Sequence, residues 1–261
     1  MDEWSHAIKF PALCDFLESL TKHGVTKEQK VAKMRRFLTR CRDNLPQTGN
    51  ASLFPIMRLL LPQLDQERGS YGIKETVFAK LFIDLLKMAP NSKDSLRLKN
   101  YKAPANARGA KNDVNDFASV LFEVIKDRAN DRRGVQVMTI EDVNKQLTNM
   151  VVLNAQRQGV NEILMDMFKH MDSVMIKWVV RIILKDLKLG LGTAAIFNCF
   201  HQDAREFFDT NANLRKVCEA LKDPQKRMHE VQISLFTAFK PMLAESVAID
   251  KIEGDQILDQ K

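Results

Sequence analysis

The apolar residues of this 261-residue sequence recur every three or four positions in one segment after another. That spacing places them on one face of an α-helix, whereas a β-strand needs a period of two, which no segment sustains. Proline and glycine fall mostly between these segments, where they begin or end helices. The 10 glycines and 8 prolines are also few for a sandwich or barrel with many tight turns. We therefore expect an all-α fold, a compact multi-helix domain of about ten or more helices.

Most of the expected helices have recognisable boundary signals. Thr26 and Gln29 form a capping-box pattern, and Thr139 is the expected N-cap of a later helix. We expect helices between Pro11 and Gly24, from Thr26 towards Pro46, from a Ser52 cap to Pro62, between Gly72 and Pro90, and at 114–128, 140–154, 161–171, 173–188, 193–208 and 212–222. The stretch 91–112 has six basic residues and one acid, and its second half lacks apolar periodicity, so we interpret it as a basic surface loop.

The segment 173–188 is the most apolar of the chain, so its helix should lie at the centre of the core. Lys177, Arg181 and Lys185 recur every four residues, which places them along one edge of that helix. Arg181 and Arg58 each have two open interpretations. They belong either to a basic binding surface or to buried ion pairs.

The charge balance favours a polyanionic partner. Lys and Arg number 40 against 33 Asp and Glu, a formal net charge of +7. The four cysteines have no Cys-x-x-Cys spacing, so we expect reduced, partly buried thiols of an intracellular protein. The histidines are equally scattered, and no metal site is expected. No apolar run is long enough to predict a membrane span, and the first ten residues show no secretory signal.

A weak internal repeat links two parts of the chain. Residues 57–64 (MRLLLPQL) resemble residues 180–187 (VRIILKDL), and each copy leads to a glycine loop and then to an apolar helix. Two similar helix pairs could arise by chance in a helical protein. The sharper interpretation is a pseudo-two-fold pair of helix–loop–helix units. The candidate loop residues are Gly72 and Lys74 in the first copy and Lys185, Lys188, Gly190, Gly192 and Thr193 in the second.

Such a loop can hold a phosphate group. Its backbone N–H groups and the start of the following helix attract an anion, and glycine allows close approach. Residues 187–197 (LKLGLGTAAIF) resemble the helix-hairpin-helix element of non-sequence-specific DNA-binding proteins. A glycine C-cap followed by Thr193 as an N-cap would produce the same string for purely structural reasons. Lys102, Arg108 and Lys111 are further binding candidates on charge alone.

Longer segments resemble a known family. Similarity to eukaryotic ATP-dependent DNA ligases, and within them to the DNA ligase IV group, extends over residues 59–82, 178–204, 216–224 and 233–244. The runs YGIKET (71–76) and KDLKLG (185–190) point to that group, and KPMLA (240–244) resembles the element that precedes the ligase catalytic core. The resemblance implies that residues 1–239 are an N-terminal helical DNA-binding domain. It also implies that residues 240–261 are a linker towards an adenylation domain that is absent from this sequence.

The resemblance further implies a function. It implies non-sequence-specific binding of nicked or broken duplex DNA, by phosphate backbone and minor groove, in double-strand break repair by non-homologous end joining. The parent enzyme would be nuclear and would use ATP and magnesium. No Asp-Gly dipeptide occurs in the sequence, so the Lys-x-Asp-Gly nucleophile motif is missing, and we expect neither catalysis nor a cofactor in this chain. The implied partners are duplex DNA with a nick or end and the remaining ligase domains, with no membrane.

An alternative function is protein interaction. In vertebrate DNA ligase IV the first helices bind a peptide of the nuclease Artemis, and Phe37 and Leu38 lie at the corresponding place here. Arg40 and Cys41 depart from the family pattern, in which an apolar aromatic side chain helps to form the groove. Exposure of Phe37 and Leu38 would support the docking of an Artemis-like nuclease peptide. Burial of both in the core would count against it.

Overall fold

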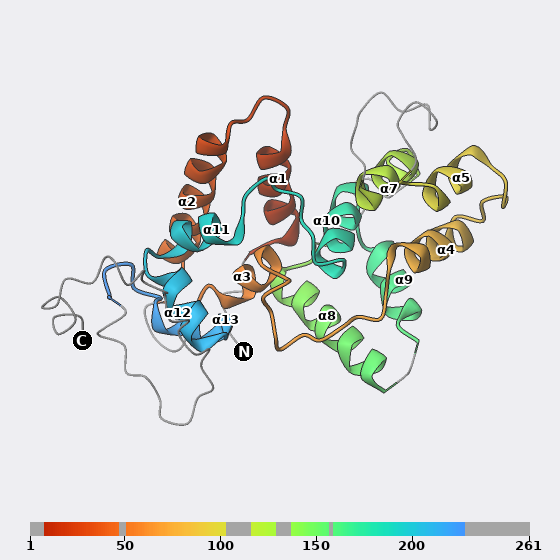
Figure 1. Ribbon diagram of the computed structural model, residues 1–261. Coiled ribbons are helices and arrows are strands. Elements are labelled where there is room, and N and C mark those ends of the chain that lie inside the picture. Colours follow the sequence, from red (N-terminus) through yellow and green to blue (C-terminus); the bar gives the residue numbers. More distant parts are fainter. Residues whose placement is uncertain (1–7, 47–50, 103–115, 129–136, 157–158, 228–261) are drawn as a thin grey trace, which may run out of the picture.

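The computed structural model describes residues 8–46, 51–102, 116–128, 137–156 and 159–227, which form twelve α-helices and no strand (Figure 1). The all-α prediction is confirmed. The helices are α1 Phe10–Thr21, α2 Lys27–Asp43, α3 Phe54–Leu60, α4 Glu75–Leu85, α5 Lys93–Lys99, α7 Phe117–Ile125, α8 Ile140–Ala155, α9 Asn161–Lys169, α10 Ser173–Ile183, α11 Thr193–Phe200, α12 Ala204–Asn211 and α13 Leu214–Ala220. None of these helices is long and apolar enough to cross a membrane.

Local hydrogen bonds explain where several helices begin. At the start of α2, the Gln29 N–H donates to Thr26 Oγ1 (3.3 Å), and the Thr26 N–H donates to Gln29 Oε1 (3.1 Å). Thr139 caps α8 in the same way, with Asp142 as its reciprocal partner. Pro11 lies in the first turn of α1, where its missing N–H would have no partner in any case. Both capping predictions are confirmed.

The helix expected at 173–188 is shorter than predicted, because α10 ends at Ile183. Lys185 has a positive φ of 57°. The Asp186 N–H then donates to the Arg181 carbonyl at 3.1 Å, which closes the helix end. A lysine stands where this type of helix end usually has a glycine, so the sequence carries no signal for it.

Two other expectations for segment boundaries are wrong. The segment 193–208 is divided into α11 and α12 at His201, whose backbone is extended with φ of −159°. His201 Nδ1 accepts the backbone N–H two residues further on, at 3.0 Å, which favours a break there. In the stretch 91–112, interpreted as a loop, Ser92 caps the short helix α5. Ser52, by contrast, lies one residue before the N-cap position of α3, and its Oγ accepts the Phe54 N–H at 3.4 Å, as expected of a cap.

Helix α10 lies at the centre of the fold, in contact with both α1 and α7 (Figure 1). Trp178 has no exposed surface, and its indole N–H donates to Glu18 of α1 at 2.7 Å. Phe78, Phe117 and Phe197, which come from three other helices, are buried in the same core. The prediction that this segment is central is therefore confirmed.

Two of the three basic residues expected along one edge of α10 face inward. Lys177 Nζ lies 2.5 Å from a Glu18 carboxylate oxygen. Arg181 Nη2 donates to Asp116 at 2.6 Å and to Ser119 Oγ at 2.9 Å. Of the two interpretations of Arg181, the buried ion pair is the one that the structure has.

All four cysteines are buried and free, as expected for structural thiols. Burial raises the pKa of the Cys41 thiol to about 12. An inert packing role follows, because a thiol that stays protonated is a poor nucleophile. Within the described residues, no three His, Cys, Asp or Glu side chains lie together in a way that could hold a metal ion.

The Arg181–Asp116 pair makes the stability of the core depend on pH. Burial alone would raise the pKa of Asp116, but the Arg181 charge and the hydrogen bonds from Arg181 and Ser119 outweigh it and lower this pKa. The folded-state pKa is thus below the unfolded value of about 3.9. The pair therefore stabilises the fold above that pH, and this contribution is lost as the pH falls through the folded-state pKa.

We expect Asp116→Asn to lower the free energy of unfolding by about 3 kcal/mol at pH 7, because the Arg181 charge would remain buried without its counter-charge. The variant should also lose less stability than the wild type on acidification. Denaturant unfolding at several pH values measures both effects. Asp94→Asn is the control, because its partner Arg128 is 45% exposed and surface pairs contribute about 0–1 kcal/mol. Equal losses for the two variants would contradict a buried pair.

Candidate functional site

Two loops in the structure share one backbone geometry. The first glycine loop, residues 70–74, precedes α4, and the second glycine loop, residues 188–193, precedes α11. Gly72 has a φ of 69° and Gly190 a φ of 68°. In both loops the helix begins three residues after that glycine, and the residue just before the helix is extended. The two copies of the sequence repeat therefore form the same turn.

The first copy carries five additional residues between the repeat and its glycine, since it takes eight residues (64 to 72) where the second takes three (187 to 190). This charged insertion, residues 65–69, contains Asp65, Glu67 and Arg68. Its side chains form ion pairs and hydrogen bonds with residues of α3, α8 and α13. These bonds hold the irregular segment that leads to the first glycine loop.

Arg68 is the most deeply placed residue of the charged insertion, with 2% of its surface exposed. Its Nη2 donates to the backbone oxygen (2.8 Å) and the side-chain oxygen (2.7 Å) of Asn144 on α8. Its Nε donates to Thr148 Oγ1 at 3.3 Å and lies 3.8 Å from an Asp65 oxygen. Burial lowers the pKa of Arg68 to about 10, so the side chain stays protonated at neutral pH.

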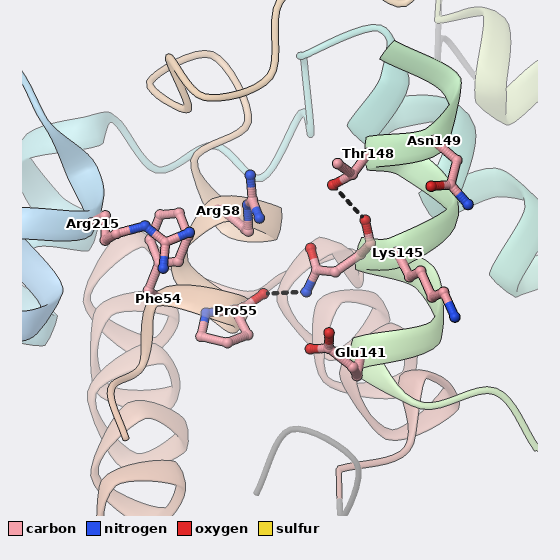
Figure 2. Close-up of a pocket in the computed structure, with 9 residues that line it drawn as sticks. Phe54, Pro55, Arg58, Glu141, Lys145, Thr148, Asn149 and Arg215 are labelled. Atoms are coloured by element: carbon pink, nitrogen blue, oxygen red, sulfur yellow. Dashed lines mark hydrogen bonds between the residues drawn. The ribbon is translucent and has the colours of Figure 1, made fainter. Parts of the chain in front are cut away.

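A hollow beside the charged insertion has a volume of about 300 Å³. Figure 2 shows the residues of α3, α8 and α13 that border it. Two guanidinium groups stack on the Phe54 ring, Arg215 at 4.1 Å and Arg58 at 4.6 Å from the ring centroid. Arg58 pairs with Asp65 at 2.9 Å, and Arg215 pairs with Glu67 at 2.7 Å. Arg58 is therefore an ion-pair residue, and both arginines of the hollow are already neutralised.

Lys185, three residues before the second glycine loop, contacts the charged insertion that leads into the first glycine loop. Its Nζ donates to the Arg68 carbonyl at 3.1 Å and lies 6.0 Å from the centroid of the Tyr71 ring. The side chain is half-buried. This bond thus connects the segment before the second glycine loop to the charged insertion before the first, although 117 residues separate the two partners.

The other candidate lysines of the loops are exposed. Lys188 is 55% exposed, and its Nζ lies 2.5 Å from a carboxylate oxygen of its neighbour Asp186. Lys74 is the exposed N-cap residue of α4. Lys102 is also exposed, with its Nζ 5.6 Å from the centroid of the Tyr101 ring. Each could meet a phosphate without unfolding any part of the core.

The glycines of the second loop differ from one another. Gly190 needs its positive φ, but Gly192 has a φ of −76° and is the N-cap of α11. Thr193 is the first residue of α11 and is not the N-cap, which overturns the capping alternative for this threonine. The N–H groups of Gly190, Leu191 and Gly192 meet no acceptor among the described residues. These N–H groups can therefore donate hydrogen bonds to an anion.

Some of the candidate residues lie outside the described residues. These are Arg108 and Lys111 of the basic loop and all of the proposed linker, residues 240–261. Their placement stays a prediction from the sequence. The described part of the site therefore consists of the two glycine loops and the elements that hold them.

A separate groove of about 410 Å³ runs between α1 and α2. Phe37 is half-buried there and stacks on Phe16, with ring centroids 3.9 Å apart. Leu38 has no exposed surface, which removes it from the proposed docking residues. Arg40 and Cys41 both line the groove. Only one of the two candidate docking residues is thus available to a partner.

Sequence reasoning missed two residues that contact the glycine loops. Lys30 of α2 reaches the second loop, where its Nζ donates to the Leu189 carbonyl at 2.9 Å. Asn154 of α8 reaches the first loop, where its Nδ2 donates to the Ser70 carbonyl at 2.8 Å. Both contacts join residues far apart in the sequence, so no local pattern could have indicated them.

Two comparisons with known proteins, one with family models and one with curated sequences, point to the same family. Residues 9–201 match the family described as DNA ligase N terminus. The chain is 38% identical to DNA ligase 4 of Homo sapiens over 256 residues, which are 95% of this chain and 27% of that protein. It is 42% identical to DNA ligase 4 of Gallus gallus over 204 residues (77% and 22%) and 35% identical to that of Arabidopsis thaliana over 257 residues (96% and 20%). The chain spans about a quarter of the length of these curated relatives.

The glycine geometry predicts unequal effects of alanine. We expect Gly72→Ala to lower the free energy of unfolding by about 2 kcal/mol, because a side chain would be strained at positive φ. The added Cβ would also lie 2.0 Å from Asn154 Oδ1. Gly192→Ala should change the same free energy by less than about 1 kcal/mol, since its φ is ordinary and no atom lies within 4 Å of the added Cβ. Denaturant unfolding of both variants decides this, and a larger loss at Gly192 would contradict it.

Proposed function

The chain belongs to the family of DNA ligase N-terminal domains, and we propose that it binds nicked or broken duplex DNA without sequence preference. The contacts would run along the phosphate backbone and the minor groove. One observation carries the proposal: Lys185 connects the segments that lead into the two glycine loops, and Lys74 and Lys188 are exposed in those loops. The biological setting that we propose is double-strand break repair by non-homologous end joining in the nucleus.

The chemistry of the loops suits a phosphodiester backbone. Free N–H groups and the start of α11 attract anions, and the exposed lysines add charge. Glycine places no side chain between the loop and the DNA. A ligase must act on any sequence, and contacts with phosphates carry no sequence information. A pair of such loops could follow the two sides of a nick.

Ligation itself would be carried out elsewhere in a longer protein. The sequence contains no Asp-Gly dipeptide, so it lacks the Lys-x-Asp-Gly nucleophile motif of the family. We propose that ATP and magnesium act in the remaining ligase domains, and that this chain holds the duplex for them. The basic residues Lys102, Arg108 and Lys111 would extend the same DNA-binding surface.

The groove between α1 and α2 supports a second candidate function, the docking of an Artemis-like nuclease peptide. Phe16 and Phe37 form an apolar floor, while Lys33, Arg36 and Arg40 line the groove with positive charge. Among the residues that the structure describes, no acidic side chain lines it. These features favour an acidic peptide with aromatic or aliphatic side chains. Arg40, which departs from the family pattern, would then contribute charge in place of an aromatic surface.

DNA binding can be tested at Lys188. We expect Lys188→Ala to weaken binding to nicked duplexes of unrelated sequence equally, by about fivefold at 0.15 M salt, and to reduce the slope of log affinity against log salt by about 0.9. Fluorescence anisotropy at several salt concentrations measures both. Lys126→Ala is the control, because Lys126 is 43% exposed and also pairs with a neighbouring carboxylate, Glu123.

Three outcomes would overturn the proposed function. One is wild-type binding that does not depend on salt, and another is strong preference for one DNA sequence. The third is equal binding by Lys188→Ala and Lys126→Ala. Thermal unfolding of both variants should give midpoints near that of the wild type, because both side chains are exposed.

Peptide docking can be tested by charge reversal in the groove. We expect Arg36→Glu to abolish measurable binding of a synthetic peptide that carries two aromatic residues flanked by aspartates. Arg35→Glu is the matched control, because Arg35 is exposed on the same helix but does not line the groove. Isothermal titration measures the binding. Equal loss in both variants, or no binding by the wild type, would contradict the second candidate function.

A further inference from the structure

Lys30 of α2 places its charge against the second glycine loop. Its Nζ donates to the Leu189 carbonyl at 2.9 Å. A Cβ atom added to Gly190 would lie 2.9 Å from the same nitrogen. Helices α2 and α11 lie side by side, which brings this lysine to a loop 159 residues away (Figure 1). The ammonium group is therefore next to the glycine of that loop that has a positive φ.

The ammonium group of Lys30 has capacity for another acceptor. A lysine carries three N–H donors, and one of these bonds to the Leu189 carbonyl. Lys30 forms no ion pair with any described residue, and its side chain is half-buried. The backbone N–H groups of Gly190 and Leu191 also meet no acceptor in the described part of the chain. An anion that rests on this loop could bond to all three groups.

We propose that Lys30 is a further phosphate-binding residue of the second glycine loop. It holds the loop through the Leu189 carbonyl and presents its charge to the phosphate that the loop receives. This inference rests on the proposed DNA-binding function and adds a residue from a helix that no loop motif includes. It makes the second glycine loop the main phosphate position of the pair.

In the first glycine loop a different side chain lies beside the glycine, so the two loops are unequal as phosphate sites. There the distant side chain is Asn154, whose Nδ2 donates to the Ser70 carbonyl at 2.8 Å. That bond directs the amide oxygen towards Gly72, where an added Cβ would lie 2.0 Å from it. An oxygen acceptor repels a phosphate, whereas the Lys30 ammonium attracts one. At Gly72 the first loop thus lacks the positive charge that the second loop has at Gly190, and its phosphate contact would come from Lys74.

Helix α2 also supplies a matched control. Lys33 lies three residues after Lys30, is half-buried like it, and donates to a backbone carbonyl, that of Ser19 on α1, at 2.8 Å. It thus resembles Lys30 in helix, burial and type of bond, but it points to α1 and away from the second loop. Any general effect of removing a lysine from α2 should appear in both positions.

The experiment compares Lys30→Met with Lys33→Met in the whole chain, using a nicked duplex as the probe. We expect Lys30→Met to weaken binding about fivefold at 0.15 M salt and to lower the salt slope by about 0.9, the value for one phosphate contact. Lys33→Met should bind like the wild type. Lys30→Arg should restore the slope, because it keeps the charge, and Lys30→Gln should not. If Lys30→Met does not fold, the comparison of Lys30→Arg with Lys30→Gln gives the same answer.

Unchanged slopes for Lys30→Met and Lys30→Gln would overturn the inference, as would equal losses at Lys30 and Lys33. A slope that Lys30→Gln retains would also overturn it, because that result assigns Lys30 a purely structural role. Failure of the proposed function looks different, since the wild-type chain itself would then show no salt-dependent binding. Thermal midpoints of all variants separate loss of binding from loss of fold.

Discussion

The buried charge of Arg68 is the constraint on which the arrangement of the two glycine loops depends. A guanidinium with 2% exposure needs hydrogen bonds and a counter-charge inside the protein, and its Nη2 and Nε find them on α8 and near Asp65. These bonds hold a segment that has no helix of its own. Because that segment is fixed, its backbone carbonyl at Arg68 can accept a bond from Lys185. This bond connects the segments that lead into the two loops.

The basic residues of the chain thus divide into those that build the fold and those that remain for a partner. Arg181 and Arg58 satisfy buried or half-buried carboxylates, and Lys185 bonds to a backbone carbonyl. Lys74 and Lys188 stay exposed at the loops. A formal net charge of +7 favours a polyanionic partner, but it does not show where that partner would bind. The binding surface depends on which basic residues are bonded within the fold and which remain exposed.

Much of the fold could be predicted from the sequence, because the signals that begin a helix lie within a few residues of one another. Thr26 and Thr139 mark helix starts by a side-chain bond to residues three positions away, and the apolar run around Trp178 marks the central helix. The end of α10 could not be predicted, since Lys185 adopts a positive φ without being glycine. The role of Lys30 could not be predicted either. It depends on how α2 packs against a loop 159 residues away, which no local pattern records.

The two glycine loops also show how one backbone geometry can acquire two roles. Each has a glycine near φ of 70° three residues before a helix, so the turn itself is shared. The first copy gained or kept a charged insertion, and its glycine is covered by an amide oxygen from Asn154. The second copy is short, and an ammonium group from Lys30 lies against its glycine. Gly72 therefore leaves room for the Asn154 side chain of α8, whereas Gly190 leaves room for Lys30 and for a ligand of opposite charge.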